Sequence, residues 1–270
     1  SMTATPIPRS LALVLYGDLD RSILDEYPAG RKPIQTSIVE PGREAPAYDI
    51  MRKEMDAGHQ IFVVCPLIEE SDALGANSVH DVHKEFITGA FEGYRVLMLH
   101  GRMKTKEKDD VMRAFASGEA DMLISTTVVE VGVDVPNATV MYVEGAERFG
   151  LAQLHQLRGR VGRGAHQSHC FLHPTGMLGE IARMRLQAVV DSQDGFDLAE
   201  KDLQLRGPGN IFSTEQSGFD QFKLGTMHDI DLMGSAKDFS KELLDESPDL
   251  SAYPALKKRL LSYVDEVHFE

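Results

Sequence analysis

The sequence predicts an α/β fold: a mostly parallel sheet with helices on both faces, followed by a smaller helical C-terminal extension. Short apolar runs alternate with helical segments between residues 33 and 175. Parallel strands need such an order, because each crossover between them usually contains a helix. After Pro174 only helical segments and turns follow. The predicted parts are therefore residues 1–32, 33–175 and 176–270.

The predicted strands are short apolar runs, which have the length of a buried strand rather than that of a helix. They lie at residues 34–39, 60–65, 95–99, 121–125, 139–144 and 168–173. Helical segments are predicted between most of them, at residues 48–57, 77–91, 106–116 and 151–161. The alternation indicates a sheet that is buried on both faces.

The remaining segments have linker or helical character. Residues 27–33 contain two prolines and a glycine, which is typical of a linker. Two more helices are predicted at 181–190 and 198–205, and a helical tail after His228 is interrupted at Ser247 and Pro248.

The composition is that of a globular protein, with 42% hydrophobic and 26% charged residues. No apolar run is long enough to cross a membrane and no charged-then-apolar leader is present, so we expect a cytoplasmic protein without a membrane partner. Cys65 and Cys170 each lie in an apolar run and are expected to be buried. Neither the cysteines nor the histidines have the spacing of a zinc site.

The net charge of -14 argues against tight DNA binding by this chain alone, because Lys and Arg supply most non-specific affinity for DNA. Local charge differs from this average. One basic cluster contains Arg102, Lys104, Lys106 and Lys108, and a second contains Arg158, Arg160 and Arg163.

Residues 156–164 hold Gln156, Arg160 and Arg163 in a frame of glycines that includes Gly159. Arginine suits a phosphate site, because its planar guanidinium stays charged and bonds phosphate with two donors. Glycine lets the backbone approach closely. The alternative interpretation is a basic surface turn that closes a helix, where arginines offset the helix dipole.

A second polar segment follows the predicted strand at 121–125 and contains Thr126, Thr127, Gly132 and Asp134. Ligands of open α/β sheets bind at the carboxyl ends of strands. The hydroxyls and the carboxylate could there meet phosphate, ribose or water. Alternatively, they cap a short turn.

Two further segments complete an ordered set: residues 1–9, and His100-Gly101-Arg102-Met103 after the strand at 95–99. In this order, the four segments resemble the motifs of superfamily-two nucleic-acid helicases and translocases. The surrounding sequence, over nearly the whole chain, resembles the C-terminal half of the bacterial RecG family. The resemblance implies a RecA-like motor domain at 33–175, preceded by the end of a first motor domain and a linker at 1–32.

The resemblance also implies a role for each motif residue. Arg160 and Arg163 are candidate arginine fingers that act with Gln156, while Gly132, Asp134 and Gly159 lie on the nucleotide side. The residues implied to contact DNA are His100, Gly101, Arg102, Thr126 and Thr127. Thr3, Ala4 and Thr5 resemble the motif that relays the nucleotide state to the DNA.

Residues 194–209 and 215–218 resemble the translocation motif that RecG shares with the transcription-repair coupling translocase. In those families this motif forms a helical hairpin and loop that convert motor closure into DNA movement. Arg206 and Gln216 are the coupling candidates. The alternative is a plain helical hairpin packed on the motor.

The sequence contains neither a Gly-x-x-x-x-Gly-Lys-Ser/Thr loop nor an Asp-Glu-x-His or Asp-Glu-x-Gln box. We therefore expect a piece of a longer ATP-dependent DNA helicase, in which ATP and Mg²⁺ bind with the help of a first motor domain. No cofactor is expected on this piece alone. The expected partners are branched DNA, such as stalled forks and recombination intermediates, and the N-terminal wedge and first motor domain of the same enzyme. The alternatives are a fragment of the transcription-repair coupling translocase and a non-catalytic DNA- or nucleotide-binding module.

Overall fold

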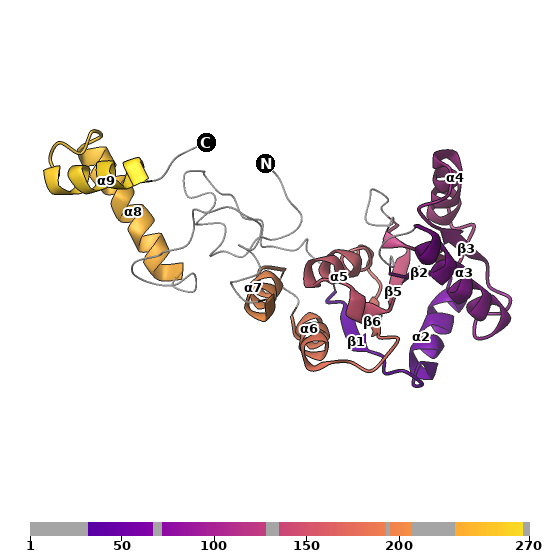
Figure 1. Cartoon of the computed structure of the whole chain (residues 1–270). Coiled ribbons are helices and arrows are strands. Elements are labelled where there is room, and N and C mark those ends of the chain that lie inside the picture. Colours follow the sequence, from indigo (N-terminus) through magenta and orange to yellow (C-terminus); the bar gives the residue numbers. More distant parts are fainter. Residues whose placement is uncertain (1–31, 67–71, 128–134, 193–194, 207–229, 267–270) are drawn as a thin grey trace. The chain divides into compact units, whose positions relative to one another are not determined.

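The computed structural model describes residues 32–66, 72–127, 135–192, 195–206 and 230–266 (Figure 1). These residues form two compact units. One contains the sheet and the helices α2 to α7 as far as Leu205, and the other contains α8 and α9.

The first unit is built on six strands that pair in the order β1-β6-β5-β2-β4-β3 (Figure 1). Every pairing in this sheet is parallel, which confirms the predicted α/β class. The strands are β1 (Gln35–Ile38), β2 (Gln60–Val64), β3 (Val96–Leu99), β4 (Met122–Ser125), β5 (Ala138–Glu144) and β6 (His169–His173). All six predicted strands are therefore present.

The central strands are apolar along their whole length because both faces of the sheet are covered. Every residue of β2 and of β4 is buried. In the register of the sheet, Phe62 lies beside Leu123 on one side and beside Met141 on the other. Continuous apolar runs are typical of parallel sheets for this reason.

Helices pack on both faces of the sheet and bury two separate apolar clusters. Helices α2 and α3 cover one face, where Met51 and Phe86 pack against Ile61 and Tyr142. The other face is covered by α4, α5 and α6, where Phe115 of α4 lies with its ring centroid 4.9 Å from that of Phe62. The helices of this unit are α2 (Ala45–Asp56), α3 (Asp72–Thr88), α4 (Thr105–Ala116), α5 (Leu151–Arg158), α6 (Glu180–Asp191) and α7 (Gly195–Arg206), with the short 3-10 helix η2 (Ala146–Arg148).

Several helix boundaries differ from the prediction: α3 was expected at residues 77–91 but runs from Asp72 to Thr88, and α7 begins at Gly195 rather than at residue 198. Two other differences have local explanations. Helix α5 was expected to continue to residue 161 but ends at Arg158. Arg160 and Val161 continue it only as tighter turns, with backbone hydrogen bonds to Leu157 and Arg158, before Gly162 takes a left-handed φ of 74° and turns the chain away. Helix α2 begins at Ala45 rather than at residue 48, since a proline stands in its first turn, where a missing N–H costs no hydrogen bond.

The second unit contains α8 (Ile230–Glu246) and α9 (Pro254–Glu266). Helix α8 ends just before Ser247 and Pro248, as predicted. The turn between the helices is ordered by polar contacts, because the backbone N–H of Ala252 donates to the hydroxyl of Ser247 at 3.2 Å. Hydrogen bonds from Ser251 hold the pKa of Asp249 well below its usual range, at about 2.

Both cysteines are buried and carry free thiols, as predicted from their place in apolar runs. Burial raises the pKa of Cys170 to about 12, so this thiol stays protonated. None of the helices in the described ranges is both long and apolar enough to span a lipid bilayer.

Candidate functional site

The parallel sheet separates the candidate residues into two groups at opposite edges. Because all six strands run in the same direction, their carboxyl ends lie at one edge and their amino ends at the other. His100 and Thr126 directly follow β3 and β4, so they lie at the carboxyl edge. Residues 159–167 join α5 to the start of β6, so this loop, called the finger loop below, lies at the amino edge.

The finger loop begins where α5 ends. Leu151, Leu154 and Leu157 anchor α5 in the core, which leaves Gln156 partly exposed on the other side of the helix. Gly159 caps the helix with a φ of −68°. Arg160 is partly buried, whereas Arg163 is exposed and donates from Nε to the carbonyl oxygen of Gly159 at 3.3 Å.

Two glycines of the finger loop are required by close packing at the amino edge. A Cβ atom on Gly162 would lie 2.9 Å from Cγ1 of Ile34, which precedes β1. A Cβ atom on Gly164 would lie 2.9 Å from the carbonyl oxygen of Pro136, which precedes β5. Contacts of 2.9 Å are too short for a Cβ atom, so only glycine lets the loop approach these two segments.

The contact with Pro136 brings together the two segments that were expected to face the nucleotide. Thr126 leaves the carboxyl end of β4, but Val135 and Pro136 have reached the amino edge, where β5 begins at Ala138. Thr126 and Pro136 therefore lie at opposite edges of the sheet. Gly132 and Asp134 themselves lie outside the described residues.

Arg158, which was counted in the second basic cluster, is buried. Its residue exposure is only 2%, and its guanidinium donates to the carbonyl oxygens of Val189 at 2.8 Å and Ser192 at 2.5 Å. A second contact, at 3.0 Å, joins its Nη2 to Nδ1 of His155. Arg158 therefore adds no exposed charge to this cluster, because its side chain satisfies carbonyl groups at the end of α6.

At the carboxyl edge, His100 is followed by Gly101 and Arg102, which are exposed. The ring centroid of His100 lies 5.4 Å from that of His80 in α3. Burial, and then the charges of His80, Arg102 and Lys108, lower the pKa of His100, although Glu107 acts in the opposite direction. This edge therefore combines an exposed arginine with a histidine in basic surroundings, which suits contact with phosphate.

The two threonines after β4 differ in exposure. Thr126 is only 1% exposed, while Thr127 is partly exposed. The hydroxyl of Thr126, like that of Ser125 and Nδ1 of His100, is buried and has no hydrogen-bond partner among the described residues. Of the two threonines, Thr127 is therefore the more accessible residue.

A partly buried charged cluster at the carboxyl edge was not predicted from the sequence. His173 at the end of β6 contacts Glu144 through Nδ1 at 2.8 Å and Glu44 through Nε2 at 3.2 Å. Burial opposes protonation, but the hydrogen bonds and charges of Glu144 and Glu44 outweigh it and raise the pKa of His173. The pKa of Glu44 is lowered, because backbone hydrogen bonds and His173 outweigh the effect of its own burial. No local sequence signal marks this cluster, since Glu44 and His173 are 129 residues apart.

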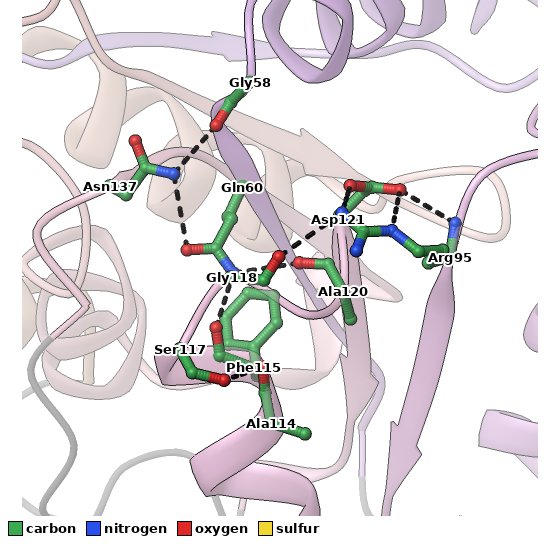
Figure 2. Close-up of polar contacts among 10 residues, drawn as sticks. All are labelled: Gly58, Gln60, Arg95, Ala114, Phe115, Ser117, Gly118, Ala120, Asp121 and Asn137. Carbon is green, nitrogen blue, oxygen red and sulfur yellow. Dashed lines mark hydrogen bonds and ion pairs between the residues drawn. The ribbon is translucent and has the colours of Figure 1, made fainter.

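Figure 2 shows a second network that the sequence did not reveal, at the amino edge. Gln60 is 3% exposed, and its amide donates to the carbonyl oxygens of Phe115 at 2.6 Å and Ala120 at 2.9 Å. Beside it, Arg95 forms an ion pair of 2.6 Å with Asp121. These contacts tie the end of α4 to the starts of β2, β3 and β4.

The other candidate residues are not placed by the structure. Thr3, Ala4, Thr5 and Gln216 lie outside the described ranges. Arg206 is the last residue of α7, but its side chain is also outside the described part. Among the described residues, no group of three or more His, Cys, Asp or Glu side chains is arranged to hold a metal ion.

Two family profiles match this chain and define its class. Residues 46–165, which contain most of the sheet, match the helicase conserved C-terminal domain. Residues 192–262 match domain 3, C-terminal, of the ATP-dependent DNA helicase RecG. The fold is thus that of a helicase domain, and the second match favours RecG over a transcription-repair coupling translocase.

The similarity to individual RecG proteins extends over almost the whole chain. It is 46% identical over 268 residues to the ATP-dependent DNA helicase RecG of Synechocystis sp., covering 99% of this chain and 32% of that protein. It is 47% identical over 250 residues to RecG of Thermotoga maritima, covering 92% and 32% of the two proteins. The chain belongs to the RecG family and spans about a third of the length of these relatives.

A solved structure of RecG bound to a three-way DNA junction has the same fold. The TM-score is 0.66 at 44% sequence identity, and the match covers 87% of this chain and 30% of the RecG chain.

Proposed function

We propose that this chain is the second motor domain and the translocation region of an ATP-dependent DNA helicase that remodels stalled replication forks and branched recombination intermediates. The observation that carries the proposal is the finger loop, which holds Arg160 and Arg163 at one edge of a helicase sheet in a RecG-family chain. The relative bound to a three-way junction supports branched DNA as the substrate.

In this proposal the amino edge faces the nucleotide. Arg160 and Arg163 hold the γ-phosphate from across a cleft whose other wall is the first motor domain, and Gln156 and Gly159 complete this side with Gly132 and Asp134. Bound ATP with Mg²⁺ supplies the free energy of the motor. The closely packed glycines support the assignment, because they fix the backbone that carries both arginines. The ligands of Mg²⁺ and the phosphate loop come from the first motor domain.

The carboxyl edge contacts the DNA backbone. His100, Gly101 and Arg102 form one part of this contact, and Thr127 forms the other, with Thr126 buried behind it. The exposure of Arg102 and the basic surroundings of His100 support this role. DNA and nucleotide therefore act on opposite edges of one rigid sheet, and residues 126–136 run between the edges.

The remaining residues couple ATP hydrolysis to movement along the DNA. Thr3, Ala4 and Thr5 relay the nucleotide state from the end of the first motor domain within residues 1–32. Residues 33–175 form the second motor domain. Residues 176–270 form the translocation region, in which Arg206 and Gln216 pass motor closure to the DNA. As a RecG-type enzyme of bacteria, the protein would work in the cytoplasm on chromosomal DNA.

The test compares ATP hydrolysis by the full-length enzyme and by the 270-residue chain, each with a three-way DNA junction. We expect junction-stimulated turnover by the full-length enzyme and none by the chain alone, because the chain lacks the phosphate-loop lysine and the magnesium-binding acids. Alone, the chain would be a weak DNA-binding module. Steady DNA-stimulated turnover by the highly purified chain would contradict the proposal.

A further inference from the structure

Three consecutive residues at the turn from α2 into β2 contact three different segments at the amino edge: Gly58, His59 and Gln60, the first residue of β2. Gly58 takes a left-handed φ of 83°, which turns the chain from the helix into the strand. Its carbonyl oxygen accepts a hydrogen bond of 2.9 Å from Nδ2 of Asn137, directly after Pro136 (Figure 2). Gln60 holds the end of α4 through Phe115 and Ala120.

The third member of this turn, His59, contacts the finger loop. Its ring centroid lies 4.4 Å from that of His166, at an angle of 48° between the ring planes. His166 is exposed and lies three residues after Arg163. Rings at this distance are in van der Waals contact.

His59 is itself held in place from the opposite side. Its Nδ1 lies 2.7 Å from Oε2 of Glu54 in α2. The same carboxylate oxygen accepts a hydrogen bond of 2.8 Å from the hydroxyl of Thr139 in β5. The contact with Glu54 therefore holds the imidazole of His59 in place, and the finger loop packs against this ring through His166.

The contacts of the finger loop differ in kind along its length. Gly162 and Gly164 fix its backbone by close packing against Ile34 and Pro136. Near its end, the amide of Gln167 donates to the carbonyl oxygen of Pro33 at 2.8 Å. His166 adds a contact of a different kind, because it packs its ring against the ring of His59.

We propose that His59 is a positioning residue for ATP hydrolysis, which sets the finger loop through its ring contact with His166. The inference rests on the proposed function, because it needs Arg160 and Arg163 to act on the γ-phosphate. His59 touches neither nucleotide nor DNA in this role. A displacement of about 1 Å at a catalytic group is enough to lower turnover strongly, so a loop that loses one of its contacts lowers kcat more than it weakens binding.

The experiment uses the full-length enzyme with a saturating three-way junction and compares His59→Ala, His166→Ala, the double variant and His166→Phe. We expect each alanine variant to lower kcat for ATP about fivefold, with KM changed less than about twofold. The double variant should be no worse than either single variant, because both remove the same contact. Phenylalanine at position 166 keeps a ring against His59 and should restore kcat to within about twofold of wild type.

Arg95→Ala is the matched control. It breaks the ion pair with Asp121 at the same edge of the sheet without touching the finger loop, so its kcat should equal that of the wild type. The inference is wrong if both histidine variants hydrolyse ATP at the wild-type rate, if their losses add, or if phenylalanine fails to rescue. If Arg163→Ala also leaves turnover unchanged, the proposed function itself has failed, whereas a loss with Arg163→Ala alone refutes only the role of His59.

Discussion

The guanidinium of Arg158 at the end of α5 donates a hydrogen bond of 2.5 Å to the carbonyl oxygen of Ser192 at the end of α6. The same side chain also satisfies the carbonyl oxygen of Val189. Arg158 thus joins the end of α5, which leads into the finger loop, to the end of α6. Two arginines of the same nine-residue motif therefore differ in their surroundings: Arg158 is buried and hydrogen-bonded to α6, whereas Arg163 is exposed.

Arg158→Ala should therefore destabilise the fold, because it leaves two carbonyl groups without their partner and opens space in the core. We expect a loss of about 2 to 4 kcal/mol in the free energy of unfolding. Arg163→Ala, at an exposed position, should change it by less than about 0.5 kcal/mol. Urea unfolding of the 270-residue chain measures both. Equal stability of the two variants would show that Arg158 has no structural role.

The cluster of His173, Glu144 and Glu44 predicts a stability that depends on pH. The folded state raises the pKa of His173 above its ordinary value of 6.5, so the protonated imidazole stabilises the fold. This contribution is fully present below pH 6.5 and is lost as the pH rises through the raised pKa of the folded state. Urea unfolding between about pH 6 and about pH 9 should show a decline that His173→Gln reduces. An identical pH profile in the variant would exclude His173 as its source.

The sheet could be predicted from the sequence because its central strands are buried on both faces. A run such as Ile61 to Val64 is apolar without interruption, and its short length and β-branched residues favour a buried strand over a buried helix. Helix ends were less predictable. Helix α5 ends at Arg158, and the loop that follows it packs through Gly162 against Ile34, a residue far away in the sequence.

The candidate site was only partly predictable for the same reason. The motif at residues 156–164 identified the finger loop, but not which of its arginines is buried, since that depends on the carbonyl groups of α6. The contact of His59 with His166 joins residues that carry no motif of their own. Sequence spacing within one segment reveals a motif, whereas contacts between segments require the fold.

The two threonines after β4 should respond differently to substitution. Thr126→Val replaces a buried hydroxyl that has no partner among the described residues, so it should leave stability unchanged or raise it. Thr127→Val removes a partly exposed hydroxyl and should weaken DNA binding by the full-length enzyme more than Thr126→Val does. Titration of a labelled three-way junction at fixed salt compares the affinities. Weaker binding by the Thr126 variant than by the Thr127 variant would reverse the assignment.

Arg206 provides a test of coupling in the full-length enzyme. If Arg206 acts after hydrolysis, by passing motor closure to the DNA, Arg206→Ala should impair fork unwinding much more than DNA-stimulated ATP hydrolysis. If it only packs, unwinding, hydrolysis and melting temperature should fall together, as for a charge that loses its partner. Measuring all three on one preparation distinguishes the two roles, and a parallel loss would discard the coupling role.

The most direct test of the central claim is the rate of junction-stimulated ATP hydrolysis by full-length Arg163→Ala enzyme. An arginine that stabilises charge on the transferred phosphate acts mainly in the transition state, so kcat should fall about a thousandfold while ATP binding changes much less. Arg160→Ala should behave similarly. Arg113→Ala, which removes an exposed arginine of α4 away from the finger loop, is the control and should keep the wild-type rate. Wild-type turnover by both the Arg163 and Arg160 variants would show that the finger loop does not serve the nucleotide.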